Sequence, residues 1–378
     1  MIKNIKFNDL NRSFKLIKKS YFKNLKRIHK NSEYINGKDV KFFENKLSKF
    51  INTKYIISCG NGTDALMLSI FSLNLKKNDE VIIPAFSYIS VIEVVLLFGL
   101  KPVLVDVDPQ TFNMDIMELE KSITTKTKLI IPVHLFGSNC DMEKIIKIAK
   151  KNNIFVIEDA AQSISSKVNI NNKKIDSGTI GNIGCTSFFP TKNLGCFGDG
   201  GAVITNSDKL ARKIKMLRNH GQKNKYIHNI IGFNSRLDSI QALALSLKIK
   251  YLKKENQLRK KNALRYNSDL KEIKQIIIPK KTKFSDHIYH QYSIRIINGQ
   301  RNELRTFLAK KGISTIIYYP LPIQSQKAYK NKVKKIGHLP NSMLISKQIL
   351  SLPIYPYLRK DELTYIIKTI KEFFNEKK

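Results

Sequence analysis

Short apolar runs alternate with longer amphipathic runs along the first two thirds of the chain. The apolar runs are rich in β-branched residues and typical of strands buried on both faces, at residues 56–58, 81–83, 103–105, 129–133 and 154–157. Between them, apolar positions recur at helical spacing in residues 40–50, 63–73, 91–98 and 141–150. This alternation predicts an α/β fold built on a mostly parallel sheet.

The pattern changes after Gly232-Phe233-Asn234. One long helical pattern runs from Asp238 to about Lys271, and strand and helix patterns from about residue 275 onward form a smaller α+β unit. No low-complexity linker separates the two parts, so we expect them to pack together. We predict a large domain over residues 1–250, which includes an N-terminal helix, and a small C-terminal domain over residues 251–378.

Composition narrows the class of protein. A hydrophobic fraction of 42% and a charged fraction of 26% are those of a soluble globular protein. The apolar patches, such as Val91 to Leu100, are too short to span a bilayer, and the N-terminus lacks an apolar run of signal length. We expect a cytoplasmic protein with no membrane partner. The four cysteines form no C-x-x-C pair and have no histidine at zinc spacing, so no metal site is expected.

The formal net charge of +37 raises the alternative of a nucleic-acid-binding protein. Only 11 of the 67 basic residues are Arg, the residue best suited to bidentate recognition of phosphates and bases. The lysines are spread over the whole chain, as on an ordinary solvated surface. We therefore expect no specific nucleic-acid partner.

Ligands of parallel α/β sheets bind outside the carboxyl ends of the strands, so the loops there are candidates for a site. The turn from Gly60 to Asp64 precedes a predicted helix, where free N–H groups and the helix dipole can bind a phosphate. The same sequence is also typical of an ordinary glycine-rich turn between a strand and a helix. Residues 84–88 place aromatic side chains after a strand, either to stack on a flat heterocycle or to fill the core. His134 follows another strand, and we assign it a structural role.

Two further loops carry reactive groups. In the run from Glu158 to Gln162 a carboxylate can hold a protonated ring nitrogen and the amide a phenolic oxygen, the alternative being a helix cap by Asp159. The run from Ser187 to Gly201 surrounds Lys192 with aromatics, a proline and glycines, and burial of an ammonium frees the neutral amine as a nucleophile. A nucleophilic amine, a carboxylate, a stacking aromatic and a phosphate cradle are together what pyridoxal phosphate requires.

From Asn36-Gly37 to its end, the chain resembles the DegT/StrS family of pyridoxal-phosphate-dependent nucleotide-sugar aminotransferases. The motifs that carry the resemblance follow one another in family order: Asn61-Gly62-Thr63-Asp64-Ala65-Leu66, Asp79-Glu80-Val81-Ile82, Val133-His134-Leu135-Phe136-Gly137, Glu158-Asp159-Ala160-Ala161-Gln162, Ser187 to Gly201, Arg218-Asn219-His220-Gly221, Gly232 to Asp238 and Ser351-Leu352-Pro353.

The resemblance implies the type I aminotransferase fold, with a large αβα domain and a small C-terminal domain, and pyridoxal 5'-phosphate as cofactor. It makes Lys192 the Schiff-base lysine and proton carrier. It also implies Asp159 at the pyridine nitrogen, Gln162 at the ring hydroxyl, Tyr88 stacked on the ring, and Gly62, Thr63 and Ser187 at the phosphate. Asn234 would reach the same phosphate from the other subunit of a homodimer, and Arg236 beside it would face the substrate.

Two departures from the family pattern concern the sugar. Tyr318-Tyr319-Pro320 stands where relatives commonly read His-Tyr-Pro, and Gln324 stands where they commonly carry a second histidine. Both positions lie near the sugar in the family, so Tyr318, Tyr319 and Gln324 are expected substrate contacts. Some members carry His at the lysine position and dehydrate sugars, so Lys192 favours transamination.

The expected activity is transfer of an amino group from an amino acid, L-glutamate, to a nucleotide-linked 3-keto sugar in cell-surface polysaccharide or amino-sugar biosynthesis. The sequence of residues 185–190 and 234–238 most resembles that of family members that act on 3-keto sugars. A 4-keto sugar is the alternative within the family. A cofactor-bound regulatory protein without turnover is the alternative outside it, because fold does not guarantee function.

Overall fold

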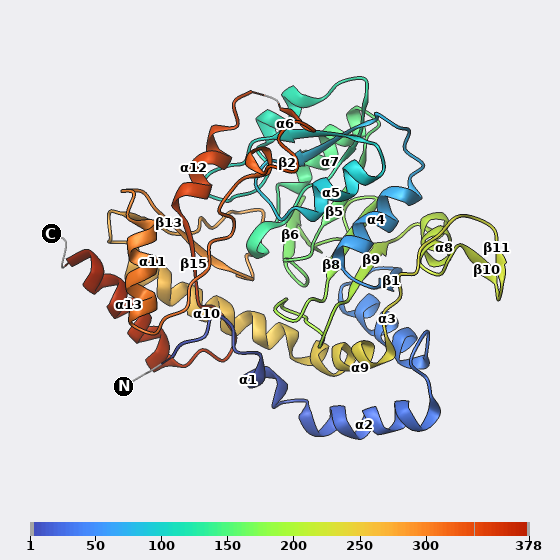
Figure 1. Cartoon of the computed structure of the whole chain (residues 1–378), viewed down its shortest axis with the longest axis horizontal. Helices are drawn as coiled ribbons and strands as arrows, with labels where there is room; N and C mark the ends of the chain where they lie inside the picture. Colours follow the sequence, from blue (N-terminus) through green and yellow to red (C-terminus); the bar gives the residue numbers. More distant parts are fainter. Residues whose placement is uncertain (1–3, 336, 376–378) are drawn as a thin grey trace.

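The computed structural model describes residues 4–335 and 337–375, and its centre is one eight-stranded sheet (Figure 1). In spatial order the strands are β1 (Tyr55–Cys59), β9 (Gly201–Thr205), β8 (Ile183–Ser187), β5 (Phe155–Asp159), β4 (Thr127–Ile130), β2 (Glu80–Pro84), β3 (Lys101–Val105) and β14 (Lys334–Lys335). β9 pairs antiparallel with both β1 and β8, and every other pair is parallel. The predicted, mostly parallel α/β sheet is confirmed.

Each face of the sheet is covered by helices because alternate residues of a strand point to opposite faces. In β2, Val81 and Ile83 belong to one buried cluster and Ile82 to another. One face packs against α4 (Gly62–Ser72), α5 (Ser90–Leu97) and α8 (Asp208–Leu217). The other face packs against α3 (Lys38–Phe50), α6 (Ile116–Ser122), α7 (Met142–Lys151) and α9 (Ser239–Lys248).

A second, smaller sheet is antiparallel and has the order β12 (Ile276–Ile277), β13 (Tyr292–Ile296), β15 (Ile349–Leu352). Its core is formed with α10 (Leu252–Leu270), α11 (Arg301–Lys310) and α13 (Lys360–Asn375), at the left of Figure 1. The long helical pattern from Asp238 to Lys271 is broken into α9, the 3-10 turn η2 (Ile249–Tyr251) and α10.

The two parts of the chain exchange segments at both ends. Ile5 is buried in the core of the smaller part, and its backbone pairs with Ile313. Conversely, β14 adds to the edge of the large sheet beside β3. The division into domains at residue 250 stays a prediction. A segment before it (around Ile5) packs in the smaller part, and a segment after it (β14) pairs with the large sheet.

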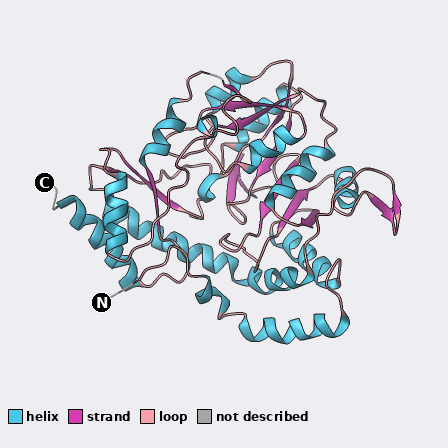
Figure 2. Cartoon of the chain, in the orientation of Figure 1, coloured by secondary structure: helices cyan, strands magenta, loops and turns pink. Residues whose placement is uncertain are grey.

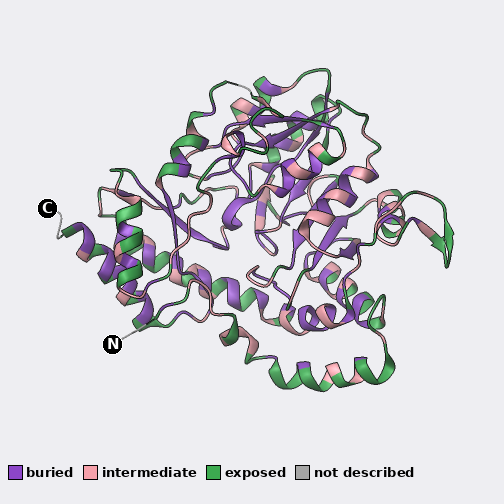
Figure 3. Cartoon of the chain, in the orientation of Figure 1, coloured by how far each residue is buried: buried purple, intermediate pink, exposed green. Residues whose placement is uncertain are grey.

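The remaining elements lie around these two sheets (Figure 2). They are α1 (Leu10–Phe14), α2 (Lys18–Asn31), α12 (Pro340–Gln348), the 3-10 turns η1 (Leu135–Gly137) and η3 (Ile323–Ser325), and the two-stranded ribbons β6 (Lys167–Ile170) with β7 (Lys173–Asp176) and β10 (Gln222–Asn224) with β11 (Ile227–His228). Figure 3 shows the sheet strands buried, whereas the β10–β11 ribbon and the outer face of α2 are exposed.

All four cysteines are buried and free, as expected of small core residues. Over the described residues, none of the helices combines the length and the apolar character needed to cross a membrane. Within the same ranges, no three His, Cys, Asp or Glu side chains are grouped so as to hold a metal ion.

Candidate active site

A cavity opens at the carboxyl ends of the parallel strands and is lined by both parts of the chain. The larger part contributes Asn61, Gly62, Thr63, Asp64, Leu66, Tyr88, Ser90, Val133, Phe136, Asp159, Ala161, Gln162, Ser187, Phe189, Thr191, Lys192 and Asp199. The smaller part contributes His290, Gln291, Tyr318 and Tyr319. Nine of the residues singled out from the sequence therefore meet in one place: Gly62, Thr63, Tyr88, Asp159, Gln162, Ser187, Lys192, Tyr318 and Tyr319.

The N-terminus of α4 forms one end of the cavity. Asn61 caps the helix, since its side-chain oxygen accepts a hydrogen bond of 2.8 Å from the Asp64 N–H. The first N–H groups of a helix have no acceptor in its own ladder, so those of Gly62 and Thr63 remain available at the cavity. A Cβ on Gly62 would lie 2.8 Å from Ser187 Cβ, so only glycine lets the turn approach the end of β8 this closely.

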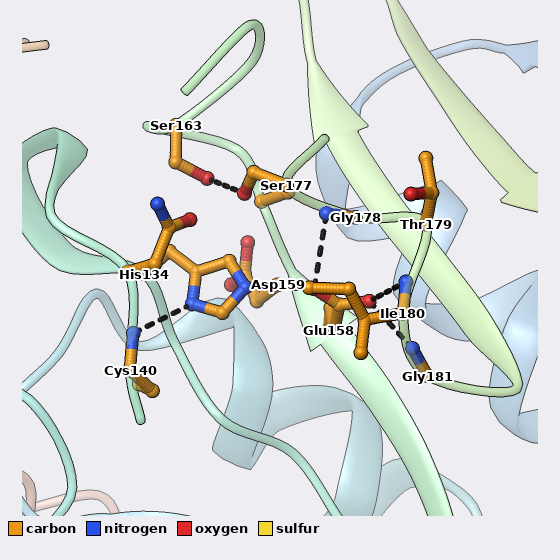
Figure 4. A network of polar contacts seen from close by, with 12 residues as sticks. His134, Cys140, Glu158, Asp159, Ser163, Ser177, Gly178, Thr179, Ile180 and Gly181 are labelled. Carbon is orange, nitrogen blue, oxygen red and sulfur yellow. Dashed lines mark hydrogen bonds and ion pairs between the residues drawn. The ribbon is translucent and has the colours of Figure 1, made fainter. Parts of the chain in front are cut away.

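The adjacent acids Glu158 and Asp159 have different surroundings because they point to opposite sides of β5. Glu158 is fully buried, and its oxygens accept N–H bonds from Gly178 at 3.0 Å and from Ile180 and Gly181 at 2.6 Å each (Figure 4). It also lies 3.0 Å from Nε2 of His134. Glu158 is thus a structural acceptor that holds the turn before β8.

His134 completes this buried network. Its Nδ1 accepts the Cys140 N–H at 3.1 Å, so its Nε2 carries the proton that is donated to Glu158 (Figure 4). The structural role predicted for His134 is confirmed by this geometry.

Asp159 faces the cavity, where its Oδ1 accepts the Ala161 N–H at 3.0 Å. Burial raises the pKa of this carboxyl, while the Ala161 N–H and the ammonium of Lys192 oppose the rise. A carboxylate kept in such a site is stabilised by a cationic partner, and a protonated ring nitrogen is one. The alternative of a helix cap by Asp159 is wrong, because a turn and not a helix follows β5, and the bond to Ala161 belongs to that turn.

Lys192 lies on the loop after β8 and projects into the cavity. Its backbone N–H donates to the Phe189 carbonyl at 2.8 Å, and a Cβ on Gly195 would lie 2.3 Å from the Pro190 carbonyl oxygen, so the loop is tightly turned. Lys248 of α9 holds the same loop through a bond of 2.6 Å to the Gly195 carbonyl. Burial lowers the pKa of Lys192 to about 8, against the opposing effect of Asp159. The neutral amine is therefore accessible near neutral pH.

Aromatic and amide side chains form the remaining wall. Gln162 accepts the Phe136 N–H at 2.8 Å and donates to the Tyr319 hydroxyl at 3.4 Å. Tyr88 is 54% exposed, and its ring centroid lies 6.2 Å from that of Tyr319. Burial raises the pKa of Tyr319, which keeps its hydroxyl protonated and able to donate.

Three predicted residues lie outside the cavity lining of the single chain. Asn234 pairs with Asn219 through the backbone, and Arg236 donates to the Asn219 side chain at 3.2 Å. Gln324 is buried and donates to Ser342 at 2.7 Å. Their roles toward a second subunit or a sugar stay predictions.

Sequence reasoning missed His290, Gln291 and Phe136 as lining residues. His290 and Gln291 directly precede the buried strand β13, and a histidine–glutamine pair at a strand end was the available signal. Their part in the cavity depends on the smaller sheet meeting the larger one, which no local pattern encodes.

A family model described as the DegT/DnrJ/EryC1/StrS aminotransferase family matches residues 15–371. A pleiotropic regulatory protein of Geobacillus stearothermophilus is 40% identical to the chain, covering 98% of it and 99% of that relative. A UDP-2-acetamido-2-deoxy-3-oxo-D-glucuronate aminotransferase of Pseudomonas aeruginosa is 41% identical, covering 94% of the chain and 96% of that relative. The solved structure of NtdA from Bacillus subtilis with bound cofactor PMP superposes with a TM-score of 0.90 at 30% identity, covering 99% of this chain and 86% of that one.

Proposed function

The chain belongs to the DegT/DnrJ/EryC1/StrS aminotransferase family, and from this membership we propose that it moves an amino group from L-glutamate to a nucleotide-linked 3-keto sugar. Pyridoxal 5'-phosphate is its cofactor, as in the family. The observation that carries the proposal is the meeting of Lys192, Asp159 and the N-terminus of α4 in one cavity. The Pseudomonas relative, whose name gives a UDP-linked 3-oxo sugar, supports the ring position and a role in polysaccharide or amino-sugar biosynthesis.

The residues of the cavity fit the cofactor. The open N–H groups of α4 and the nearby Ser187 hydroxyl would hold its phosphate, and the close approach of Gly62 to Ser187 shapes that cradle. Asp159, buried at the cavity wall, would hold the ring nitrogen, and Gln162 the ring hydroxyl. Tyr88 would cover one ring face. When bound, pyridoxal phosphate supplies an aldehyde carbon that takes up amines and a ring that withdraws electrons from the attached carbon.

The chain's own groups account for the proton chemistry. With a pKa of about 8, Lys192 can take a proton and return it near neutral pH, which matches a group that shuttles protons at the reacting carbon. Asp159 keeps a negative charge where a ring nitrogen is to stay protonated. The buried Tyr319 hydroxyl remains a donor and lines the cavity beside Gln162, where it can orient an incoming sugar.

The proposed enzyme is a cytoplasmic homodimer in which Asn234 and Arg236 serve the partner's cavity. Their positions outside the cavity of their own chain are compatible with this role. Tyr318, Tyr319 and Gln324 are proposed to select the sugar. A regulatory homologue is the second candidate, favoured by the name of the Geobacillus relative.

The test is a transamination assay with the cofactor-loaded protein, L-glutamate and matched nucleotide-linked 3-keto and 4-keto sugars. We expect amino sugar and 2-oxoglutarate in equal amounts from the 3-keto substrate, and none from the Lys192→Ala variant. Amino sugar from the 4-keto substrate alone would replace our choice of ring position. Cofactor attachment without transfer to any sugar of the panel would favour the regulatory candidate.

A further inference from the structure

His290 is the one histidine among the described residues that line the cavity, and it comes from the smaller part of the chain. It is 6% exposed, so its ring is packed against protein on most sides. The buried His134 and the half-buried His287 make their contacts outside the cavity lining. Among these three histidines, His290 is thus the one whose ring is both largely buried and at the cavity wall.

The ring of His290 contacts the residue that follows the reactive lysine. Its Nδ1 lies 3.0 Å from Oδ1 of Asn193, and Nδ2 of Asn193 donates to Oδ1 of Asn256 on α10 at 2.7 Å. Asn193 is thus held from two directions, by the segment before β13 and by α10. Because Asn193 is covalently adjacent to Lys192, fixing it fixes the direction in which the lysine leaves the loop.

The hydrogen bonds also define the charge of the ring. Asn193 Oδ1 accepts, so Nδ1 of His290 carries a proton, while Nε2 lies 3.4 Å from the Gln291 amide nitrogen and accepts from it. Burial lowers the pKa of His290, and the cations Lys192 and Arg259 lower it further. The carboxylate of Asp159 in turn favours the charged form of Lys192, and that of Glu255 favours the charged form of Arg259. His290 is a neutral ring placed next to a lysine whose neutral form is needed.

The backbone around His290 is clamped to the larger part of the chain. The Ile288 N–H donates to the Gly137 carbonyl at 3.0 Å, and the Gln291 N–H donates to the Phe136 carbonyl at 3.3 Å. Gly137 has a φ of +93°, and a Cβ there would lie 2.9 Å from the His290 nitrogen, so a side chain is excluded. The Phe136 N–H in turn donates to Gln162 in the cavity wall.

We propose that His290 is a positioning residue, which through Asn193 holds the Lys192 loop against the smaller part of the chain. The proposal rests on Lys192 being the reactive amine of the proposed function. Because the ring is neutral, its loss changes no local charge, and its effect reaches Lys192 through position and hydration alone. A loosened loop admits water to the amine, and hydration raises the pKa of an ammonium toward its ordinary value.

The test measures the lysine itself, without any sugar. Cofactor-free protein is reductively methylated with formaldehyde and cyanoborohydride between pH 6 and pH 10, and the labelling rate of the Lys192 peptide is followed by mass spectrometry. The pH at which the labelling rate reaches half of its maximum reports the pKa of Lys192. Exposed lysines in the same digest serve as the internal reference. The variants are His290→Phe, Asn193→Ala and the double variant, with His290→Gln as the conservative form that keeps a donor.

The control is His287→Phe, which replaces a half-buried histidine three positions away on the same segment. Its ring stacks on Tyr289 with centroids 3.9 Å apart, outside the cavity lining. It should lower the thermal unfolding midpoint without moving the Lys192 profile. His290→Phe and Asn193→Ala should each raise the Lys192 midpoint by about one pH unit, which is a roughly tenfold loss of neutral amine at pH 7. The double variant should shift the Lys192 midpoint by no more than either single change does. With His290→Gln the midpoint should stay close to the wild-type value.

Three results would overturn the proposal: an unchanged midpoint in folded His290→Phe, additive shifts in the double variant, or an equal shift in His287→Phe. Borohydride-trapped attachment of pyridoxal phosphate is measured on the same proteins as a second readout. A wild-type protein that attaches the cofactor at Lys192 but aminates no sugar would contradict the proposed function alone, since the methylation profile does not depend on turnover.

Discussion

Replacement of Gly62 by alanine tests the phosphate cradle at the start of α4. The added Cβ would lie 2.8 Å from Ser187 Cβ and 3.3 Å from Ser187 Oγ. Both residues line the cavity, and Ser187 ends a buried strand, so the overlap must move the serine or the turn. Overpacking of this kind costs about 1–3 kcal/mol of folding free energy, whereas exchanging glycine for alanine in a helix returns roughly 0.5–1 kcal/mol. The net loss of folding stability is therefore expected to lie between about 0 and 2.5 kcal/mol.

Cofactor affinity should fall as well, and this loss should depend on the phosphate. A hydrogen bond to a charged group contributes about 1.5–3 kcal/mol, so displacement of the Ser187 hydroxyl from a phosphate corresponds to a loss of roughly 10- to 150-fold in affinity. The assay is a fluorescence titration of the cofactor-free protein with pyridoxal phosphate and, separately, with pyridoxal, which lacks the phosphate. Gly62→Ala should weaken the first and leave the second unchanged.

The matched control is Thr63→Ala, which removes a hydroxyl at the same helix end without adding an atom. It should weaken pyridoxal phosphate binding within the same range of roughly 10- to 150-fold, since this hydroxyl would also donate to the charged phosphate, and it should leave pyridoxal binding and folding stability nearly unchanged. Equal weakening of pyridoxal and pyridoxal phosphate by Gly62→Ala would refute the phosphate assignment and indicate a general distortion. Unchanged affinity for both would place the phosphate elsewhere.

Four further predictions concern the buried charges. Borohydride reduction in the presence of pyridoxal phosphate should label wild-type protein and Lys248→Ala but not Lys192→Ala: burial lowers the pKa of both lysines to about 8, and only Lys192 lines the cavity. For the same reason the attachment rate should climb with pH up to about 8 and then level, and a rate still rising between pH 9 and pH 10 would contradict the low pKa of Lys192. Asp159→Asn should raise the unfolding temperature of the cofactor-free protein at pH 7 while slowing aminotransfer. Burial raises the pKa of Asp159, so its charged form opposes folding at neutral pH. The gain in unfolding temperature of Asp159→Asn should therefore vanish as the pH falls through that pKa. Calorimetry at several pH values checks this. Glu158→Gln should cost roughly 2–4 kcal/mol in denaturant unfolding, since an amide NH₂ cannot accept the N–H bonds that Glu158 now receives, and a loss below 1 kcal/mol would argue against the network.

The two neighbouring acids show how one strand end can serve both folding and chemistry. Glu158 points away from the cavity and holds the 178–181 turn with His134, and this turn leads into β8. β8 ends at Ser187, five residues before Lys192. The structural acid Glu158 therefore helps to place the strand that leads into the Lys192 loop, while Asp159 lines the cavity directly.

The sequence determined the local elements and the candidate chemistry. Apolar periodicity placed β1, β2, β3 and β5 to within a residue or two, because strand and helix periods are properties of adjacent residues. Asp141, the first residue of the run predicted as a helix over residues 141–150, forms the N-cap of α7 by accepting the Lys144 N–H. The presence of Lys192, Asp159 and Gly62 at the cavity was predictable for a similar reason, since each lies in a short motif at or soon after the end of a strand.

Only the tertiary structure decided which side of β5 each acid faces, and which parts of the chain close the cavity. Tyr319 reaches Gln162 across 157 residues, and His290 reaches Asn193 across 97, so neither contact is encoded in a local pattern. Such pairs depend on how the smaller sheet packs against the larger one. That packing is set by the sum of many buried contacts, and for this reason the sequence alone pointed to Lys192 but not to His290, which reaches the cavity from the smaller part of the chain.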